Sequence, residues 1–174
     1  MQDNSYRNDR DEMGDLLRQF ENLRTGLGKG FLEEEAFEKI IDYFDDKDDI
    51  ARALEAVELG VGQFPYSASL MVKKADLLIA TRKYTEALEV LEKAELLDSS
   101  DIDIYILKTD VFLALDEHEK AVGLLEEAIS LFEGDDRINL LFELADVYDD
   151  YEEFDKVFDC LAHILEYEPN NEEA

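Results

Sequence analysis

Small and apolar residues recur along this chain at a fixed spacing of 34 positions. Two columns hold small residues: Ala53, Ala87 and Ala121 in the first, Gly60, Ala94 and Ala128 in the second. Two columns hold large apolar residues, with a last step of 36: Val57, Leu91, Leu125 and Leu161 in one, Phe44, Leu78, Phe112 and Tyr148 in the other. Between the columns, apolar residues lie three and four positions apart, which predicts amphipathic helices. A period of this length predicts an array of repeated helix pairs.

The period divides most of the chain into four repeats, and a single helix pair cannot bury its own apolar face. Neighbouring pairs must therefore stack, and small residues let their helices approach to roughly 8–10 Å. We expect an all-α protein in which the two extra residues of the third repeat lie in the loop-like stretch 133–137. The expected repeats are 34–67, 68–101, 102–137 and 138–171.

The segments outside the repeats have their own patterns. Residues 1–9 are polar, and we expect them to be disordered. Residues 10–33 are expected to form a capping helix, over about 11–24, followed by a glycine-rich linker. The tail 172–174 follows a segment of the kind that leads into another first helix, so we expect truncation before a further repeat.

These columns resemble the tetratricopeptide repeat (TPR), whose 34 residues place bulky, small, aromatic, alanine and proline positions in this order. Pro65 and Pro169 stand at equivalent proline positions, although no repeat begins with tryptophan. The stretch 37–44 is also similar to TPR proteins of Bacteroidetes-type bacteria. The resemblance covers residues 34–171 and implies a right-handed α–α superhelix of about four helix pairs.

The resemblance also implies a binding groove, because first helices line the concave face in this family. One groove column is uniformly acidic: Asp42, Asp76, Asp110 and Asp146. Neighbouring columns supply apolar residues: Val72, Ile106, Phe142, Ile79 and Leu113. Lys39 and Lys73 are the basic residues among these columns. We expect a peptide-binding groove; the alternative is that the aspartates only keep the helices solvated.

The charge balance restricts the partners. Lys and Arg number 17 against 46 Asp and Glu, a formal net charge of −29. Phosphates would be repelled, so we expect no nucleic-acid and no membrane partner. TPR domains that hold acidic chaperone C-termini use lysine, asparagine and arginine at these columns, whereas this chain has acids and apolar residues. A basic or amphipathic protein segment is the better fit, although high solubility alone would also explain the charge.

Catalytic and metal-binding patterns are weak. His118 is expected to pack at a helix start, and His163 lies one helical turn from Cys160. Two potential ligands are fewer than the three or four of a zinc site. No serine or cysteine has a base in motif context. We expect no enzyme, no metal and no cofactor.

The sequence therefore predicts a scaffold or adaptor that holds a protein segment in its groove. One alternative is a TPR chaperone for a secreted or aggregation-prone protein, and another is an acidic nucleic-acid mimic. Homodimerisation through the apolar groove or the uncapped C-terminal repeat stays open. A lone cysteine and the absence of an apolar leader or membrane span lead us to expect a soluble, cytoplasmic protein.

Overall fold

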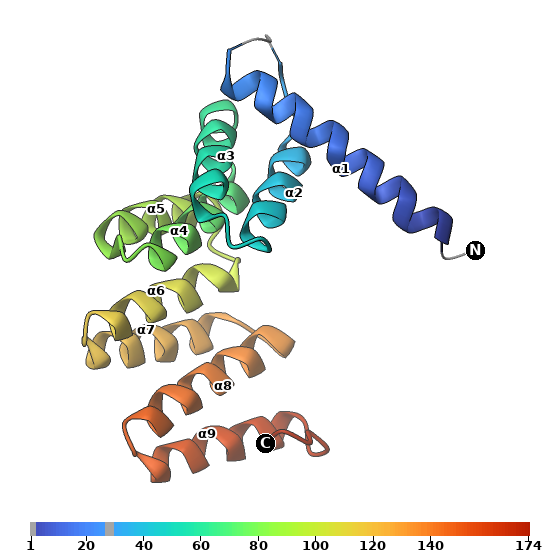
Figure 1. Cartoon of the computed structure of the whole chain (residues 1–174). Helices are drawn as coiled ribbons and strands as arrows, with labels where there is room; N and C mark the ends of the chain where they lie inside the picture. The colour runs from blue at the N-terminus through green and yellow to red at the C-terminus, as the bar shows by residue number, and fades with distance from the viewer. Residues whose placement is uncertain (1–2, 27–29) are drawn as a thin grey trace. The chain divides into compact units, whose positions relative to one another are not determined.

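The computed structural model describes residues 3–26 and 30–174, and its regular secondary structure within these ranges is entirely helical (Figure 1). The chain divides into two compact units, Met1–Leu97 and Asp98–Ala174, which we call unit 1 and unit 2. Each unit contains two helix pairs. The described residues thus confirm the expected all-α architecture of four pairs.

Unit 1 consists of one single helix followed by two helix pairs. Its helices are α1 (Asp3–Arg24), α2 (Glu34–Asp45), α3 (Ile50–Gln63), α4 (Ala68–Ala80) and α5 (Tyr84–Leu97). Helix α2 pairs with α3 and α4 with α5, while α3 packs against α4. Helix α1 packs against α2, as expected for a capping helix.

Helix α1 is longer than the sequence indicates. It begins at Asp3, so residues 3–9 are helical rather than disordered as expected, and residues 1–2 lie outside the described residues. Once a helix has nucleated, each further residue adds a hydrogen bond at little cost, which explains the extension. The helix ends before Gly26, whose φ of 69° suits glycine. Of the glycine-rich linker that follows, residues 27–29 lie outside the described residues.

Unit 2 consists of two helix pairs. Its helices are α6 (Ile102–Ala114), α7 (His118–Leu131), α8 (Gly134–Asp150) and α9 (Phe154–Tyr167). Helix α8 packs against α7, α9 and α6. The two extra residues of the third repeat do not form the loop expected at 133–137, because α8 starts at Gly134 and is 17 residues long. Asp135 and Asp136 lie in its first turn, where the helix dipole favours acidic groups.

Side-chain caps define several helix starts. The Ser67 hydroxyl accepts a hydrogen bond from the N–H of Leu70 at 3.1 Å, at the start of α4. The carboxylates of Asp49 and Asp101 accept backbone N–H groups in the same way at the starts of α3 and α6. Each cap satisfies an N–H that has no partner within its helix.

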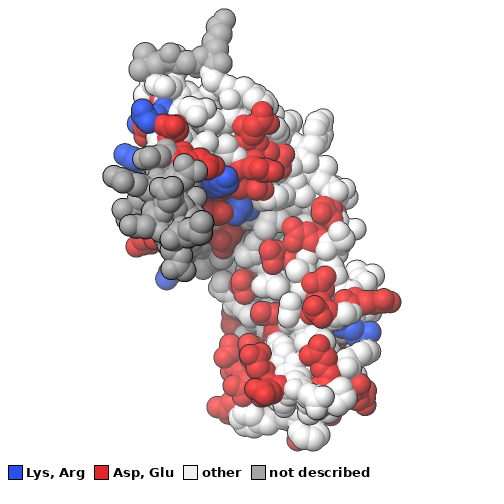
Figure 2. All heavy atoms as spheres, turned by 90° about the vertical axis from the view of Figure 1, so that its right-hand side faces the viewer, with Lys and Arg blue, Asp and Glu red and all other residues white. Residues whose placement is uncertain are grey.

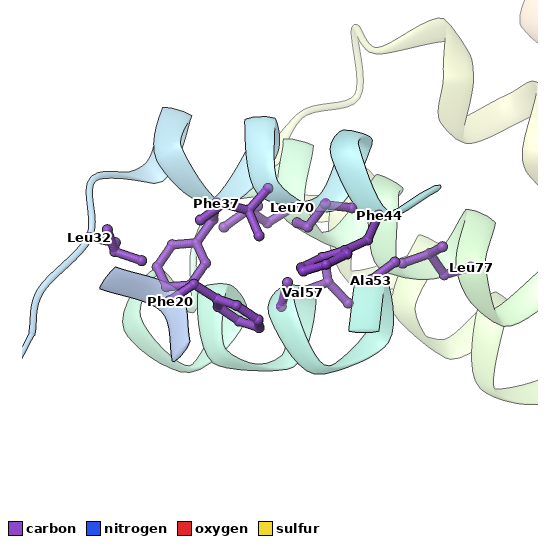
Figure 3. Packing of buried hydrophobic residues seen from close by; sticks show 11 residues of the cluster. Phe20, Leu32, Phe37, Phe44, Ala53, Val57, Leu70 and Leu77 are labelled. Atoms are coloured by element: carbon purple, nitrogen blue, oxygen red, sulfur yellow. The ribbon is translucent and has the colours of Figure 1, made fainter. Parts of the chain in front are cut away.

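The small columns face the core, as the period predicts. Ala53, Ala87 and Ala121 are fully buried. In unit 1, Ala53 lies among large apolar side chains that include Phe20 and Phe44, whose ring centroids are 5.7 Å apart (Figure 3). At Gly60 an added Cβ would lie 3.2 Å from both Phe37 and Leu70, so an alanine there would require these side chains to shift by a few tenths of an ångström.

The turn inside each helix pair has the same unusual backbone. One residue per turn adopts a left-handed conformation, with φ between 57° and 61°, and none of the four is glycine: Asp48, Arg82, Asp116 and Glu152. The N–H of the next residue donates to a carbonyl five positions earlier at 2.8–2.9 Å, the pattern of a Schellman motif. Glycine is the usual residue there, because a Cβ makes this conformation costly.

Candidate functional site

The acidic column expected from the sequence lies on the surface of the first helices. Asp42 and Asp76 are exposed on α2 and α4 of unit 1, and Asp110 and Asp146 are exposed on α6 and α8 of unit 2. The neighbouring apolar residues are half-buried: Val72 and Ile79 in unit 1, Ile106, Leu113 and Phe142 in unit 2. We call the surface of α2 with α4, and that of α6 with α8, the first-helix face of each unit.

In unit 1, internal polar contacts connect the first-helix face. Lys73 of α4 forms an ion pair with Asp42 of α2 at 2.5 Å. The hydroxyl of Ser69 donates a hydrogen bond to the Glu38 carboxylate, also at 2.5 Å. Lys73, expected as a groove residue, therefore binds a neighbouring helix of its own unit.

Lys39 has a similar role at the edge of the same unit. Its ammonium lies 3.0 Å from the Glu12 carboxylate, so it connects α2 to α1. Both lysines of the expected groove thus contact acids of unit 1.

In unit 2, the equivalent positions bring carboxylates together. Asp110 corresponds to Asp42, and Glu143 occupies the position of Lys73, because the repeats are offset by 34 and then 36 residues. Burial raises the pKa of the half-buried Glu143 carboxyl, and the negative charges of Asp110 and Asp146 raise it further. An ion pair in unit 1 is thus replaced by a group of like charges, which we call the acidic triad: Asp110, Glu143 and Asp146.

The polar contact beside the ion pair is also replaced. Ile106 in α6 corresponds to Glu38 in α2, so an apolar side chain occupies the position that accepts a hydrogen bond in unit 1. Ile106 and Phe142 are both half-buried. The first-helix face of unit 2 therefore combines a cluster of negative charge with partly exposed apolar surface.

Glu143 was missed by the sequence analysis, although the signal was present. Its column reads Lys39, Lys73, Leu107 and Glu143, so the charge changes from basic to acidic along the chain. Following this column to its end would have identified the triad.

Acidic side chains also dominate the surface of unit 2 more widely. In the lower part of Figure 2, which shows this unit, Asp and Glu form several patches beside one small basic patch. Exposed acids occur on second helices as well, for example Glu126 and Glu127 of α7. The triad differs from them because Glu143 is partly buried beside two other carboxylates.

The histidines and the cysteine lie apart from this face. His118 is the first residue of α7, as expected for packing at a helix start, and its ring stacks on Tyr151 with centroids 3.6 Å apart. His163 and the buried Cys160 line a cavity in unit 2. Among the described residues, no three His, Cys, Asp or Glu side chains are grouped so that they could hold a metal ion.

Two cavities lie between successive second helices. One of about 400 Å³ lies between α7, α8 and α9 of unit 2, and one of about 460 Å³ lies beside α3 and α5 of unit 1. They occupy equivalent places, since Glu58 and Leu78 in unit 1 correspond to Glu126 and Tyr148 in unit 2. Burial and the Glu126 charge raise the pKa of Tyr148 to about 12.

The fold is that of known repeat proteins. No protein-family model matches the chain, and no curated protein sequence does either. Among solved structures, TTC0263, a thermophilic TPR protein of Thermus thermophilus, matches with a TM-score of 0.68 and 21% identity, over 80% of this chain and 76% of its own. MamA matches with a TM-score of 0.72 and 19% identity, over 98% and 96%. YrrB, described as a TPR protein with an unusual peptide-binding site, matches with a TM-score of 0.58 and 17% identity, over 80% of this chain and 71% of its own.

These likenesses show that the chain has the tetratricopeptide-repeat fold, and they confirm the resemblance found in its sequence columns. At these identities they show the fold alone. In the described part of the chain, none of the helices combines the length and the apolar character needed to cross a bilayer.

Proposed function

We propose that the protein is a non-catalytic interaction module whose first-helix face in unit 2 binds a protein segment bearing lysine or arginine beside apolar residues. The observation that carries this proposal is the replacement of the Asp42–Lys73 ion pair of unit 1 by the Asp110–Glu143 pair of carboxylates in unit 2. A cation from the partner supplies the positive charge that Lys73 supplies in unit 1.

The physical basis is the energy of like charges in a partly desolvated place. A Lys ammonium placed about 4 Å from a carboxylate gains roughly 4 kcal/mol at an effective dielectric constant of about 20, before the cost of desolvation. Exposed pairs retain about 0.2–1 kcal/mol of this, and partly buried ones more. Ile106 and Phe142 offer apolar contact beside the charge, so an amphipathic segment gains from both features.

The comparisons support the general class. YrrB, a protein of this fold, is described as having a peptide-binding site. A nucleic-acid mimic would need its charge gathered in one stripe, whereas acids are exposed on both helices of the pairs, for example Asp110 on α6 and Glu127 on α7. An adaptor that binds basic or amphipathic segments is the function we favour.

The test uses a peptide library displayed on phage and panned against the whole protein, followed by fluorescence anisotropy of the selected peptides. We expect enrichment of Lys or Arg next to apolar residues. The variant Glu143→Lys gives unit 2 a lysine at the position equivalent to Lys73 of unit 1. It should lower the affinity for these peptides at least tenfold. Glu127→Lys, an exposed position on α7, changes the net charge equally and serves as the matched control.

Two results would contradict the proposal. Equal weakening by both variants would mean that only net charge matters, and unchanged binding in Glu143→Lys would place the peptides elsewhere. Circular dichroism and thermal unfolding of both variants show that any loss of binding is not a loss of fold.

A further inference from the structure

The cavity of about 400 Å³ in unit 2 lies between its two helix pairs and is lined by residues of α7, α8 and α9. Its apolar lining is buried, with no side chain more than 8% exposed: Ile129, Leu141, Leu144 and Cys160. The other lining residues are polar: Glu126, Tyr148, Lys156, Asp159 and His163. Small-molecule sites are clefts of roughly 300–1,000 Å³ in which a few polar groups accompany an apolar lining. This cavity, which we call the α7–α9 cavity, therefore fits a small organic ligand in size and lining.

The charged side chains of the α7–α9 cavity indicate which ligand it takes. Glu126 of α7 and Asp159 of α9 form no ion pair with any of the described residues. The Tyr148 hydroxyl donates a hydrogen bond to the Glu126 carboxylate at 3.3 Å, and the phenol stays protonated because its pKa is raised to about 12. Lys156 has its ammonium 2.5 Å from the carboxylate of Glu153, which compensates its charge. The two unpaired carboxylates therefore give the cavity a negative charge that a cationic ligand can neutralise.

At the equivalent place in unit 1, a lysine supplies a cation for the same carboxylate. Glu58 of α3 corresponds to Glu126, and the ammonium of Lys74 from α4 lies 2.8 Å from the Glu58 carboxylate. Leu144 of α8 occupies the position of Lys74, because the repeats are offset by 34 and then 36 residues. Leu144 is 5% exposed and has no polar group that could pair with Glu126. Unit 2 thus retains the carboxylate, while an apolar side chain replaces the lysine.

We propose that the α7–α9 cavity binds a small organic amine, in which an ammonium group is carried on an apolar body. The ammonium pairs with Glu126, as Lys74 pairs with Glu58 in unit 1, and the apolar body lies on Leu144. Asp159 on the facing helix α9 adds to the attraction. An anionic ligand of the same shape is repelled by both carboxylates.

This site is separate from the acidic triad and does not depend on the function proposed for it. At roughly 100° per residue, Leu141, Leu144 and Tyr148 share one face of α8, whereas Glu143 and Asp146 lie on the opposite face. Cavities at this place occur in both units, so the site follows from the packing of successive helix pairs.

The chain contains no tryptophan, so an indole ligand can be followed by its own fluorescence. The probes are tryptamine, its neutral analogue tryptophol and its acidic analogue indole-3-propionate, each titrated with the whole protein. We expect fluorescence anisotropy to show that tryptamine binds at least tenfold more tightly than tryptophol, because only tryptamine forms the ion pair. Indole-3-propionate should bind more weakly than tryptophol. Equal affinities for tryptamine and tryptophol would overturn the proposal.

Two variants test the position of the ammonium. Glu126→Gln removes the charge and keeps the shape, so it should weaken tryptamine binding at least tenfold and leave tryptophol binding unchanged. Leu144→Lys supplies the lysine found in unit 1 and should weaken tryptamine binding as strongly. Glu127→Gln, at an exposed position outside the cavity, changes the net charge as Glu126→Gln does and is the matched control. Equal weakening by these two glutamine variants would contradict the proposal, and circular dichroism verifies that each variant is folded.

The single cysteine locates the bound ligand. Cys160 lines the cavity and is 6% exposed, so a reagent such as iodoacetamide reaches its thiol through the cavity. Tryptamine at a concentration that saturates the wild type should slow alkylation about threefold or more, as measured by mass spectrometry of the intact protein. The same concentration should have little effect on Glu126→Gln. An unchanged alkylation rate in the wild type would place tryptamine outside the cavity and overturn the proposal.

Discussion

Units 1 and 2 contain the same pair of helix hairpins but present different first-helix faces. In unit 1, Lys73 neutralises Asp42 and Ser69 donates to Glu38, so polar groups of the unit satisfy one another. In unit 2, Glu143 occupies the position equivalent to Lys73, and the carboxylates of Asp110 and Asp146 act on it. The comparison separates residues that maintain the fold, which are alike in both units, from residues on the face, which have diverged.

The largest effect is expected from changing the buried small columns, which both units have in common. Ala87→Leu in unit 1 and Ala121→Leu in unit 2 each insert a large side chain at a fully buried position. We expect each to lower the free energy of unfolding by about 1–3 kcal/mol through overpacking. Urea unfolding followed by circular dichroism measures the loss. A loss in only one unit would show that the small columns do not have the same packing role.

A smaller effect is expected from exchanging the charges that distinguish the units. Lys73→Glu gives unit 1 the like-charge arrangement of unit 2 and should lower the free energy of unfolding by about 1 kcal/mol. Glu143→Lys gives unit 2 an ion pair with Asp110 and should raise it by about 0.5 kcal/mol.

Amide hydrogen exchange measures the effect of these two variants in each unit separately. Protection should fall in α2 and α4 for the first variant and rise in α6 and α8 for the second. If both variants destabilise equally, the acidic triad is not a source of repulsion.

The smallest expected effect is a pH dependence of the stability that Glu143 gives to unit 2. The pKa of Glu143 is raised in the folded protein by burial and by Asp110 and Asp146, so the folded state binds this proton more tightly than the unfolded state. The contribution of Glu143 to stability should therefore increase as pH falls through its raised pKa towards that of a free glutamate. Thermal unfolding of wild type and Glu143→Gln should show the wild type gaining stability relative to the variant over this range. Parallel pH curves would contradict the assignment.

The fold was largely predictable from the sequence, because a period of 34 fixes which residues must be buried. Ala53, Ala87 and Ala121 were expected in the core and are fully buried there. The extra turn of α8 was not predictable from composition, because a glycine followed by two aspartates is typical of a loop. In the structure, Asp135 and Asp136 lie in the first turn of the helix, where the helix dipole favours acidic groups.

The candidate site was predictable only in part. The four aspartates were identified as a column, and they are exposed on first helices as expected. Whether an acid meets a lysine or another acid depends on which side chains two neighbouring helices bring together, and this requires the structure. Lys73 was therefore expected to face a ligand but contacts Asp42.

The left-handed residue in every hairpin turn has a consequence for how the protein opens. Residues other than glycine lose on the order of 1–2 kcal/mol in this conformation, so each hairpin is strained by itself and depends on its neighbours to stay closed. Hairpin α8–α9 has Glu152 in this conformation, and Phe154 and Phe158 of its second helix are 62% and 72% exposed. Among the helices described in unit 2, α9 buries fewer side chains than α7, so local opening of the hairpins should start there.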